Sequence, residues 1–364
     1  MISTSPITVK HFLQVVKNDT KRIAKKVKLI NSNDKDYCYD TLNKVSRSFA
    51  LVIQDLPSEL KDAVCVFYLV LRALDTIEDD MKIQDADKES LLMNFHEYCD
   101  DESFSLDNVG DKPEYVELMR NYPIIARFLS SVDTKYQLIV KDTTKEMAEG
   151  MLHFAKQEVY SKNDYNEYCH YVAGIVGQGL SKLFAKSGLE SEEFYTEMDL
   201  ANEMGLFLQK TNIIRDYQED VEEGRIFWPR DVWENYVSNY ADLKKNPENS
   251  RSIACLNAMV IDAMNHFESC LTFLSKIENE KIYRFCAIPQ LMALATLVKL
   301  YNNPNTLKEN VKIDRATTME IFAKLNNKQV FSAYSIQFLN EIKLKECDVN
   351  MIVLKEKLLK NLKN

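Results

Sequence analysis

The chain has 364 residues, a length that suits one large or two modest domains. It contains 46 basic and 55 acidic residues, which give a net charge of −9. These values exclude a small disulfide-stapled scaffold, and net acidity without a basic stripe disfavours nucleic acid as a partner. Glycine and proline supply only 8 residues each, which disfavours strand-rich and phosphate-loop folds that need glycine in tight turns. We therefore expect long helices.

Apolar residues recur at the helical period in six stretches, which predict helices over 59–80, 134–160, 193–222, 251–277, 284–301 and 329–344. Polar segments rich in Asp, Asn, Lys and Pro predict exposed loops over 82–90, 100–113, 242–250 and 302–310. No window holds the roughly 18 uninterrupted apolar residues of a membrane span. No repeat or linker divides the chain, so one continuous, soluble, all-α domain is the simplest prediction.

The segment 71–80 ends an apolar helix with three acids, Asp75, Glu78 and Asp79, on one face. Like charges at a helix C-terminus, where the helix dipole is also negative, need a cation to offset their repulsion. Carboxylate oxygens grouped in this way suit Mg²⁺ that arrives with a phosphate. A lone acidic cluster is nevertheless more often a solvated helix end, so it becomes informative only beside a second cluster.

The stretch 168–180 places glycines in a G-x-x-G-x-G pattern inside a helical segment. This is the reverse of the dinucleotide-binding fingerprint, and no strand precedes it, so a Rossmann site is rejected. Close helix packing, or room for a ligand against bare backbone, explains the glycines better. Tyr171 lies one turn before this gap, where it can face a cation or take a proton, although a tyrosine of this kind taken alone is more often a core residue.

The second polar cluster consists of Gln209, Asn212, Asp216 and Asp220, which fall on one stripe of a helix beside packed apolar residues. Because this polar stripe borders packed apolar residues, it is unlike a helix face that is only exposed to solvent. Two clusters, each beside an arginine, can face each other across a helical cavity and hold a diphosphate through several Mg²⁺ ions. Further arginines with hydroxyl or aromatic neighbours lie in 46–49 and 224–229 and are typical of phosphate contacts.

From about residue 37 to about residue 330 the chain resembles the squalene synthases, members of the all-helical trans-prenyltransferase superfamily. The segments that carry the resemblance are 46–50, 68–80, 168–180, 205–220, 227–229 and 285–290. The resemblance implies a single-domain helical isoprenoid-synthase fold with a central cavity. We place an N-terminal extension at 1–36, the catalytic domain at 37–340 and a charged amphipathic tail at 341–364.

The resemblance implies a transferase that joins two molecules of farnesyl diphosphate head to head into presqualene diphosphate. NADPH-dependent reductive rearrangement of that intermediate then gives squalene, a sterol precursor, so Mg²⁺ and NADPH are the implied cofactors. One alternative is a phytoene or dehydrosqualene synthase, which has the same first half without the reduction. A more distant alternative is a non-catalytic acidic helical module that binds metal or a partner helix.

The resemblance also assigns roles to individual residues of this sequence. The implied catalytic residues are Tyr171 as base or cation stabiliser, Phe285 beside the later cations, and Asp75, Asp79, Asp216 and Asp220. The implied metal ligands are Asp75, Glu78, Asp79, Asn212, Asp216 and Asp220. The diphosphate contacts are Ser46, Arg47, Ser48, Tyr68, Arg72, Arg215 and Arg225. The remaining substrate contacts are Phe49, Met204, Phe207, Gln209, Asn212, Pro289 and Gln290.

The implied NADPH contacts are Lys312 and Arg315, which stand in Lys312-Ile-Asp-Arg315 where the family has a more basic Lys-x-Arg-Lys. The family usually ends in a membrane-spanning segment, and the resemblance implies a monomer on the cytosolic face of the endoplasmic reticulum membrane. This chain stops at Asn364 within its charged tail. We therefore expect either a shortened chain whose anchor lies outside the given sequence, which we favour, or a naturally soluble member of the family.

Overall fold

The structure is a computed structural model that describes residues 34–46, 48–196, 198–345 and 348–363, and every regular element in these ranges is helical. The α-helices in the first half of these ranges are α2 (Asp34–Ser46), α3 (Ser48–Asp55), α4 (Ser58–Asp79), α5 (Asp85–Tyr98), α6 (Pro113–Arg120), α7 (Tyr122–Ser131), α8 (Thr134–Phe154), α9 (Lys162–Cys169) and α10 (Ile175–Ser187). The others are α11 (Met198–Arg215), α12 (Tyr217–Glu222), α13 (Arg230–Trp233), α14 (Asp242–Lys245), α15 (Ser250–Asn265), α16 (Phe267–Lys276), α17 (Glu280–Leu300), α18 (Arg315–Lys324), α19 (Lys328–Glu341) and α20 (Val349–Lys363). A π-helix, η1 (His170–Gly174), joins α9 to α10, and η2 (Glu192–Tyr195) and η3 (Pro304–Leu307) are 3-10 helices. The predicted all-α fold is confirmed.

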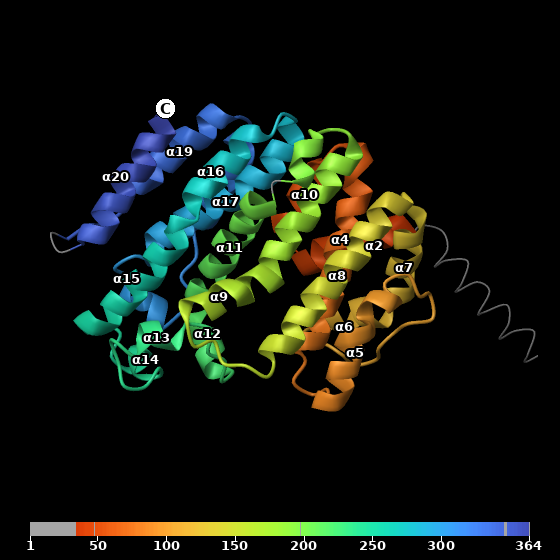
Figure 1. The fold of residues 1–364 in the computed structure, drawn as a ribbon, viewed down its shortest axis with the longest axis horizontal. Coiled ribbons are helices and arrows are strands. Elements are labelled where there is room, and N and C mark those ends of the chain that lie inside the picture. Colours follow the sequence, from red (N-terminus) through yellow and green to blue (C-terminus); the bar gives the residue numbers. More distant parts are fainter. Residues whose placement is uncertain (1–33, 47, 197, 346–347, 364) are drawn as a thin grey trace, which may run out of the picture.

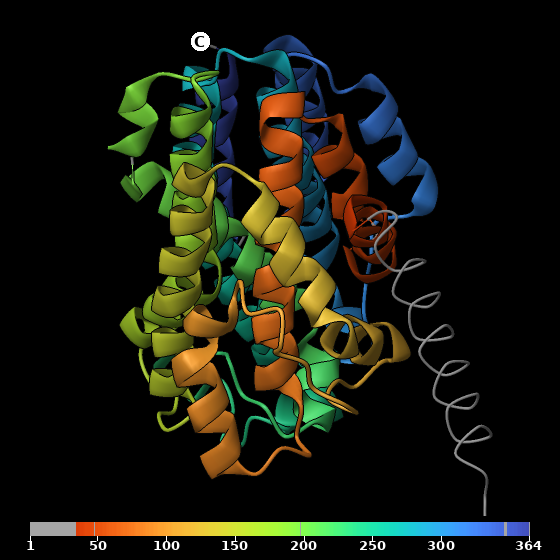
Figure 2. The same ribbon diagram turned by 90° about the vertical axis from the view of Figure 1, so that its right-hand side faces the viewer.

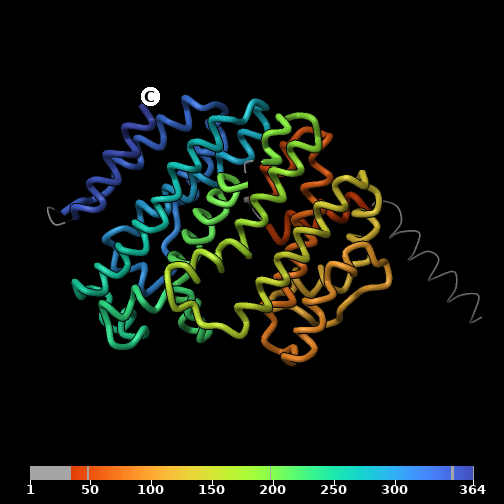
Figure 3. Tube along the Cα trace, in the orientation of Figure 1, coloured from red at the N-terminus to blue at the C-terminus, as the bar shows by residue number. Residues whose placement is uncertain are grey.

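Five helices form a ring around the centre of the molecule. In this ring α4 contacts α10, α10 contacts α11, α11 contacts α17, and α3 closes the ring between α17 and α4. Figure 1 shows α2, α5, α6 and α7 at one end of the long axis and α19 and α20 at the other, and Figure 2 shows the same ribbon from the side. Figure 3 draws the Cα trace in the same orientation, so that the path of the chain from one end of the long axis to the other can be followed by its colour. The ring therefore combines segments that are far apart in the sequence.

The buried apolar residues form one continuous core, which extends from Cys38 on α2 to Leu358 on α20. Within the described residues only α17 is long and apolar enough to cross a membrane, but 72% of its most apolar window is buried inside the protein. It is therefore a core helix of the ring. In the segment predicted as a charged tail, α20 packs along α15, α16 and α19 with Met351, Leu354 and Leu358 buried.

The glycine-rich stretch packs backbone against backbone. A Cβ atom on Gly177 would lie 2.3 Å from the carbonyl oxygen of Ala201, and one on Gly205 would lie 2.3 Å from that of Ala173. Only glycine allows η1, α10 and α11 to approach so closely. The predicted close helix packing is confirmed.

Several predicted boundaries were wrong. The helix predicted over 134–160 ends at Phe154. The helix predicted over 193–222 is interrupted at Asp216, and the one predicted over 251–277 is interrupted at His266. The loop over 82–90 is mostly helical, since α5 begins at Asp85 with acidic residues in its first turn, where the helix dipole favours them. Short helices α14 and η3 also lie within predicted loops, whereas the loop between α5 and α6 agrees with the prediction over 100–113.

Candidate active site

The ring encloses one pocket, and a second pocket adjoins it between α4, α9, α11 and α12. An apolar pocket of about 270 Å³ is lined by residues of α3, α4, α10, α11 and α17, and a polar pocket of about 320 Å³ lies beside it. The residues that line both pockets are Arg72, Asp75, Val172, Gln209 and Asn212. The two pockets are therefore the apolar end and the polar end of one cavity.

Both acidic clusters line the polar end. Asp75, Glu78 and Asp79 come from the last turns of α4, and Asp216 and Asp220 come from the junction of α11 and α12. Although α11 ends before Asp216, the stripe predicted through this region still faces one pocket. Residues about 141 positions apart in the sequence thus lie on opposite walls of one cavity.

One guanidinium joins the two clusters. Arg225 donates from Nη1 to Oδ1 of Asp79 at 3.2 Å and from Nη2 to Oδ1 of Asp220 at 3.0 Å. Its Nε is buried and has no hydrogen-bond partner in the described protein. The two other arginines of this end are paired with carboxylates as well.

Arg72 lies 3.3 Å from Asp75, measured from Nη1 to Oδ2, and donates from Nη2 to the Tyr68 hydroxyl at 3.4 Å. Arg215 donates two hydrogen bonds to the carboxylate of Asp216, from Nε at 2.8 Å and from Nη2 at 2.5 Å. Guanidinium groups in this fork geometry match phosphate oxygens equally well. The polar end can therefore exchange these ion pairs for contacts with an anionic ligand.

Three carboxyl groups of the polar end, those of Asp75, Glu78 and Asp220, have a raised pKa. Burial, together with the charge of Asp79, raises the pKa of Asp75 to about 6 although Arg72 opposes the shift. Burial and the neighbouring Asp79 and Asp75 raise the pKa of Glu78 to about 8. Burial raises the pKa of Asp220 to about 7 against the lowering effect of Arg225. Each of these groups would be stabilised as a carboxylate by an added cation.

The donor set at the polar end fits Mg²⁺. All the predicted metal ligands line this pocket: Asp75, Glu78, Asp79, Asn212, Asp216 and Asp220. Among the described residues, no three His, Cys, Asp or Glu side chains converge closely enough to hold a metal ion by themselves. Mg²⁺ usually takes one or two carboxylates from the protein and its other oxygens from substrate phosphates and water. The spread arrangement therefore suits metal that is bound together with a diphosphate.

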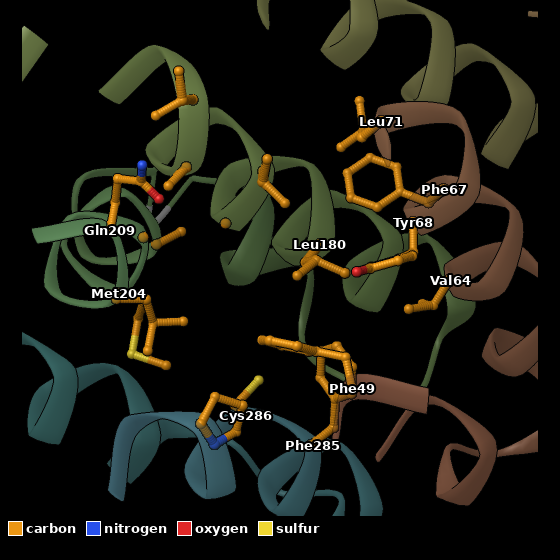
Figure 4. Close-up of a pocket in the computed structure, with 18 of the residues that line it drawn as sticks. Phe49, Val64, Phe67, Tyr68, Leu71, Leu180, Met204, Gln209, Phe285 and Cys286 are labelled. Carbon is orange, nitrogen blue, oxygen red and sulfur yellow. The ribbon is translucent and has the colours of Figure 1, made fainter. Parts of the chain in front are cut away.

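The apolar end is lined by aromatic and aliphatic side chains, as Figure 4 shows. Phe285 packs edge-to-face on Phe184 with 6.0 Å between ring centroids, and Phe49 stacks on Tyr68 at 6.3 Å. Other predicted substrate contacts that line this end are Met204, Gln209, Pro289 and Gln290. Such a wall excludes water and suits a hydrocarbon chain.

Phe207 does not line the cavity, contrary to the prediction. Its side chain is fully buried and packs against Phe267 with 5.4 Å between ring centroids, on the other side of α11. Ser46 is also buried away from both pockets, because its hydroxyl donates to the carbonyl oxygen of Leu42 at 2.7 Å. Arg47 lies outside the described residues, and of Ser48 only the backbone is described.

Tyr171 is placed differently from the prediction as well. It belongs to η1 and packs beside Phe154, and it lies so close to α8 that a Cβ on Gly150 would be 2.1 Å from its Cγ. It lines neither pocket. Tyr168, three residues earlier, lines the polar end instead and stacks on Phe227 with 5.0 Å between ring centroids.

The predicted NADPH contacts also lie outside both pockets. Lys312 and Arg315 are exposed, in the segment that leads into α18 and at the first position of that helix. The same segment touches the second acidic cluster, since Asn310 donates to Asp216 at 2.6 Å and to Glu219 at 3.1 Å. Sequence reasoning missed Asn310 because a lone amide in a polar loop has no distinguishing pattern.

Comparison with known proteins agrees with this geometry. The model of the squalene/phytoene synthase family matches residues 42–317. Squalene synthase BSS of Botryococcus braunii is 48% identical over 314 residues, which cover 84% of this chain and 67% of that protein. Squalene synthase of Mus musculus is 44% identical over 306 residues, which cover 84% of this chain and 73% of that protein.

Among solved structures, TcSQS in complex with a ligand superposes with a TM-score of 0.89 at 39% identity, covering 92% of this chain and 99% of that chain. The similarity therefore extends over nearly the whole of both chains. By the family match and by these identities, the chain belongs to the squalene/phytoene synthase family.

Proposed function

We propose that this protein is a farnesyl-diphosphate farnesyltransferase that makes squalene. It condenses two farnesyl diphosphates into presqualene diphosphate and then reduces that intermediate with NADPH. The observation that carries the proposal is the continuity of the cavity, in which a charged end meets an aromatic, water-excluding end at five shared residues. The relatives named squalene synthase, in an alga and in a mammal, support the reductive second half over the phytoene-type alternative.

The polar end is assigned to the diphosphate. Arg72, Arg215 and Arg225 would move their donors from the carboxylates to the phosphate oxygens, while Asp79 and Asp220 would be freed to hold Mg²⁺. Mg²⁺, when bound, supplies positive charge that neutralises the leaving diphosphate. The protein residues hold the leaving group in place and keep it apart from the hydrocarbon end.

The apolar end is assigned to the prenyl chains and to the cationic carbons. Phe285 presents an aromatic ring there, and the negative face of such a ring stabilises a cation. The surrounding wall keeps water from capturing the cation before the carbon–carbon bond forms. Because the two ends adjoin, ionisation at one end delivers the cation directly to the other.

We assign the tyrosine role of the first half to Tyr168 in place of Tyr171, as a hydrogen-bond donor to the diphosphate. Burial, together with the nearby Glu78, raises the pKa of the Tyr168 hydroxyl well above its ordinary value, so the phenol keeps its proton. A protonated phenol in the polar pocket can donate a hydrogen bond to the departing diphosphate. The diphosphate oxygens then remain available to accept the proton lost from the substrate.

The contacts with NADPH and the membrane are also part of the proposal. Lys312 and Arg315 would meet the phosphate groups of NADPH from the segment that Asn310 ties to the second acidic cluster. We further propose a monomer that takes up two farnesyl diphosphates at the cytosolic face of the endoplasmic reticulum membrane, as the family resemblance implies.

The test is a product assay of the purified protein with farnesyl diphosphate and Mg²⁺. Squalene should form with NADPH, and presqualene diphosphate should accumulate without it. A phytoene-type enzyme would give dehydrosqualene with or without NADPH, and a non-catalytic binding module would release no diphosphate. Asp79→Ala or Asp220→Ala should reduce turnover by several powers of ten, while Glu149→Ala, at an exposed position on α8, should leave it unchanged.

A further inference from the structure

Asp80 ends the acidic segment of α4 but does not face the cavity. Its side chain is 3% exposed and lines neither pocket. One carboxylate oxygen, Oδ1, accepts the backbone N–H of Lys82 at 2.8 Å, and Oδ2 accepts the backbone N–H of Gly110 at 2.7 Å. Both oxygens are therefore engaged by backbone donors, in contrast to the adjacent Asp79, which faces the polar pocket.

Gly110 connects this carboxylate to α6. Its φ of +125° is a conformation that residues with a side chain rarely adopt. A Cβ atom at this position would also lie 3.0 Å from both the Cβ of Tyr115 and the backbone nitrogen of Val116. The loop after α5 is thus pressed onto the first turn of α6, which packs beside α4 (Figure 1).

Tyr115, in that first turn, contacts Arg72. The guanidinium carbon of Arg72 lies 5.8 Å from the centroid of the Tyr115 ring, within the range of a cation–π contact. Arg72 lines both ends of the cavity, and its Nε is buried and donates to no acceptor within the described protein. An unpaired, buried donor on a cavity-lining arginine is suited to receive an oxygen of an anionic ligand.

We infer that Asp80 and Gly110 form a clamp that positions Arg72 through Tyr115, so that Asp80 is a positioning residue and not a metal ligand. The clamp holds α6 against the end of α4, and α6 holds the tyrosine ring beside the arginine. The inference deepens the proposed function and rests on it for one point, namely that the group received by Arg72 is a diphosphate.

The experiment measures binding of inorganic diphosphate in the presence of Mg²⁺ by calorimetry, together with thermal unfolding in EDTA. Asp80→Asn should lower the melting temperature and weaken diphosphate binding about tenfold, the size of a partly desolvated cation–π contact. Asp107→Asn is the matched control, because Asp107 lies in the same loop and pairs with Arg120 of α6 at 3.0 Å, but its side chain is 76% exposed. It should change neither quantity.

Tyr115 keeps the inference testable if Asp80→Asn does not fold. Tyr115→Leu should weaken diphosphate binding about tenfold with a nearly unchanged melting temperature, whereas Tyr115→Phe, which keeps the ring, should bind as the wild type does. In Asp80→Asn/Tyr115→Leu the two losses should not add, because both act through Arg72.

Two results would overturn the clamp. One is wild-type diphosphate affinity in both Asp80→Asn and Tyr115→Leu. The other is a higher melting temperature of Asp80→Asn in EDTA, which would place its carboxylate among the mutually repelling acids of the cavity. The proposed function is tested separately, by the product assay of the wild type. The clamp is tested by comparing diphosphate binding of the variants with that of the wild type, and this comparison can be made whether or not squalene forms.

Discussion

The raised pKa of Asp220 makes the stability of the metal-free protein depend on pH. The folded protein binds the proton of this carboxyl up to about pH 7, whereas in the unfolded chain the group loses it near its ordinary pKa of 3.8. Between these two values the folded state holds more protons, so stability falls as pH rises. The stabilisation by protonated Asp220 is complete below pH 3.8, the pKa of the group in the unfolded chain. It is lost once the pH has risen through about 7, the pKa of the group in the folded protein.

The size of the effect follows from the same shift. A full proton difference changes the free energy of unfolding by about 1.4 kcal/mol per pH unit, so from pH 5.5 to about pH 7 Asp220 alone should cost about 2 kcal/mol. Asp220→Asn carries no titrating group and should lose this part of the pH dependence. At pH 8 in EDTA the variant should be the more stable protein.

The measurement is urea unfolding of wild type and Asp220→Asn in EDTA at pH 5.5 and pH 8. Comparison of the two proteins removes the pH dependence that they share. Mg²⁺ with diphosphate should restore the wild type at pH 8 and leave the variant nearly unchanged, because binding to the folded state stabilises it. Parallel pH profiles, or a wild type that is more stable than the variant at pH 8 in EDTA, would refute the electrostatic account of this site.

Four further substitutions test the cavity and its walls. Tyr168→Phe should lower the maximal rate of presqualene diphosphate formation with little change in KM, and Tyr171→Phe should behave as the wild type does. A lower maximal rate in Tyr171→Phe alone would show that Tyr171, and not Tyr168, acts in the first half. Phe285→Leu removes a cation–π contact of about 0.5–2 kcal/mol, so presqualene diphosphate should accumulate even with NADPH, whereas equal slowing of both halves would make this residue only cavity wall. Gly177→Ala should lower the free energy of unfolding by about 1–3 kcal/mol, because its Cβ would meet the Ala201 carbonyl oxygen; unchanged stability in urea would show that the two helices separate freely.

The two acidic clusters could be predicted from the sequence because helical spacing decides which residues share a face. The spacing of Asp75 and Asp79 on α4 is regular, and both residues line the polar end. The stripe through Asp216 also reached the cavity, although the helix breaks there. Regular spacing was sufficient for the first cluster, and the short break at Asp216 did not move the second cluster out of the cavity.

The misplaced residues lie where that periodicity fails. Tyr171 lies in a π-helix, whose wider turn changes the facing of the residues that follow Tyr168, and no period of 3.6 predicts this change. Phe207 lies on α11, which is apolar on more than one face, so the pattern does not distinguish the cavity from the core. Asp80 and Gly110 are 30 positions apart and meet only through the fold.

The contact between Gly177 and α11 limits how the width of the apolar end can evolve. Both Gly177 and Gly205 line that end, and at these positions its wall is bare backbone. A larger residue at either position would force the helices apart, so it would enlarge the pocket and weaken the packing in the same step. Variants adapted to longer or bulkier prenyl chains should therefore carry their changes at flexible wall residues such as Met204, and keep the glycines.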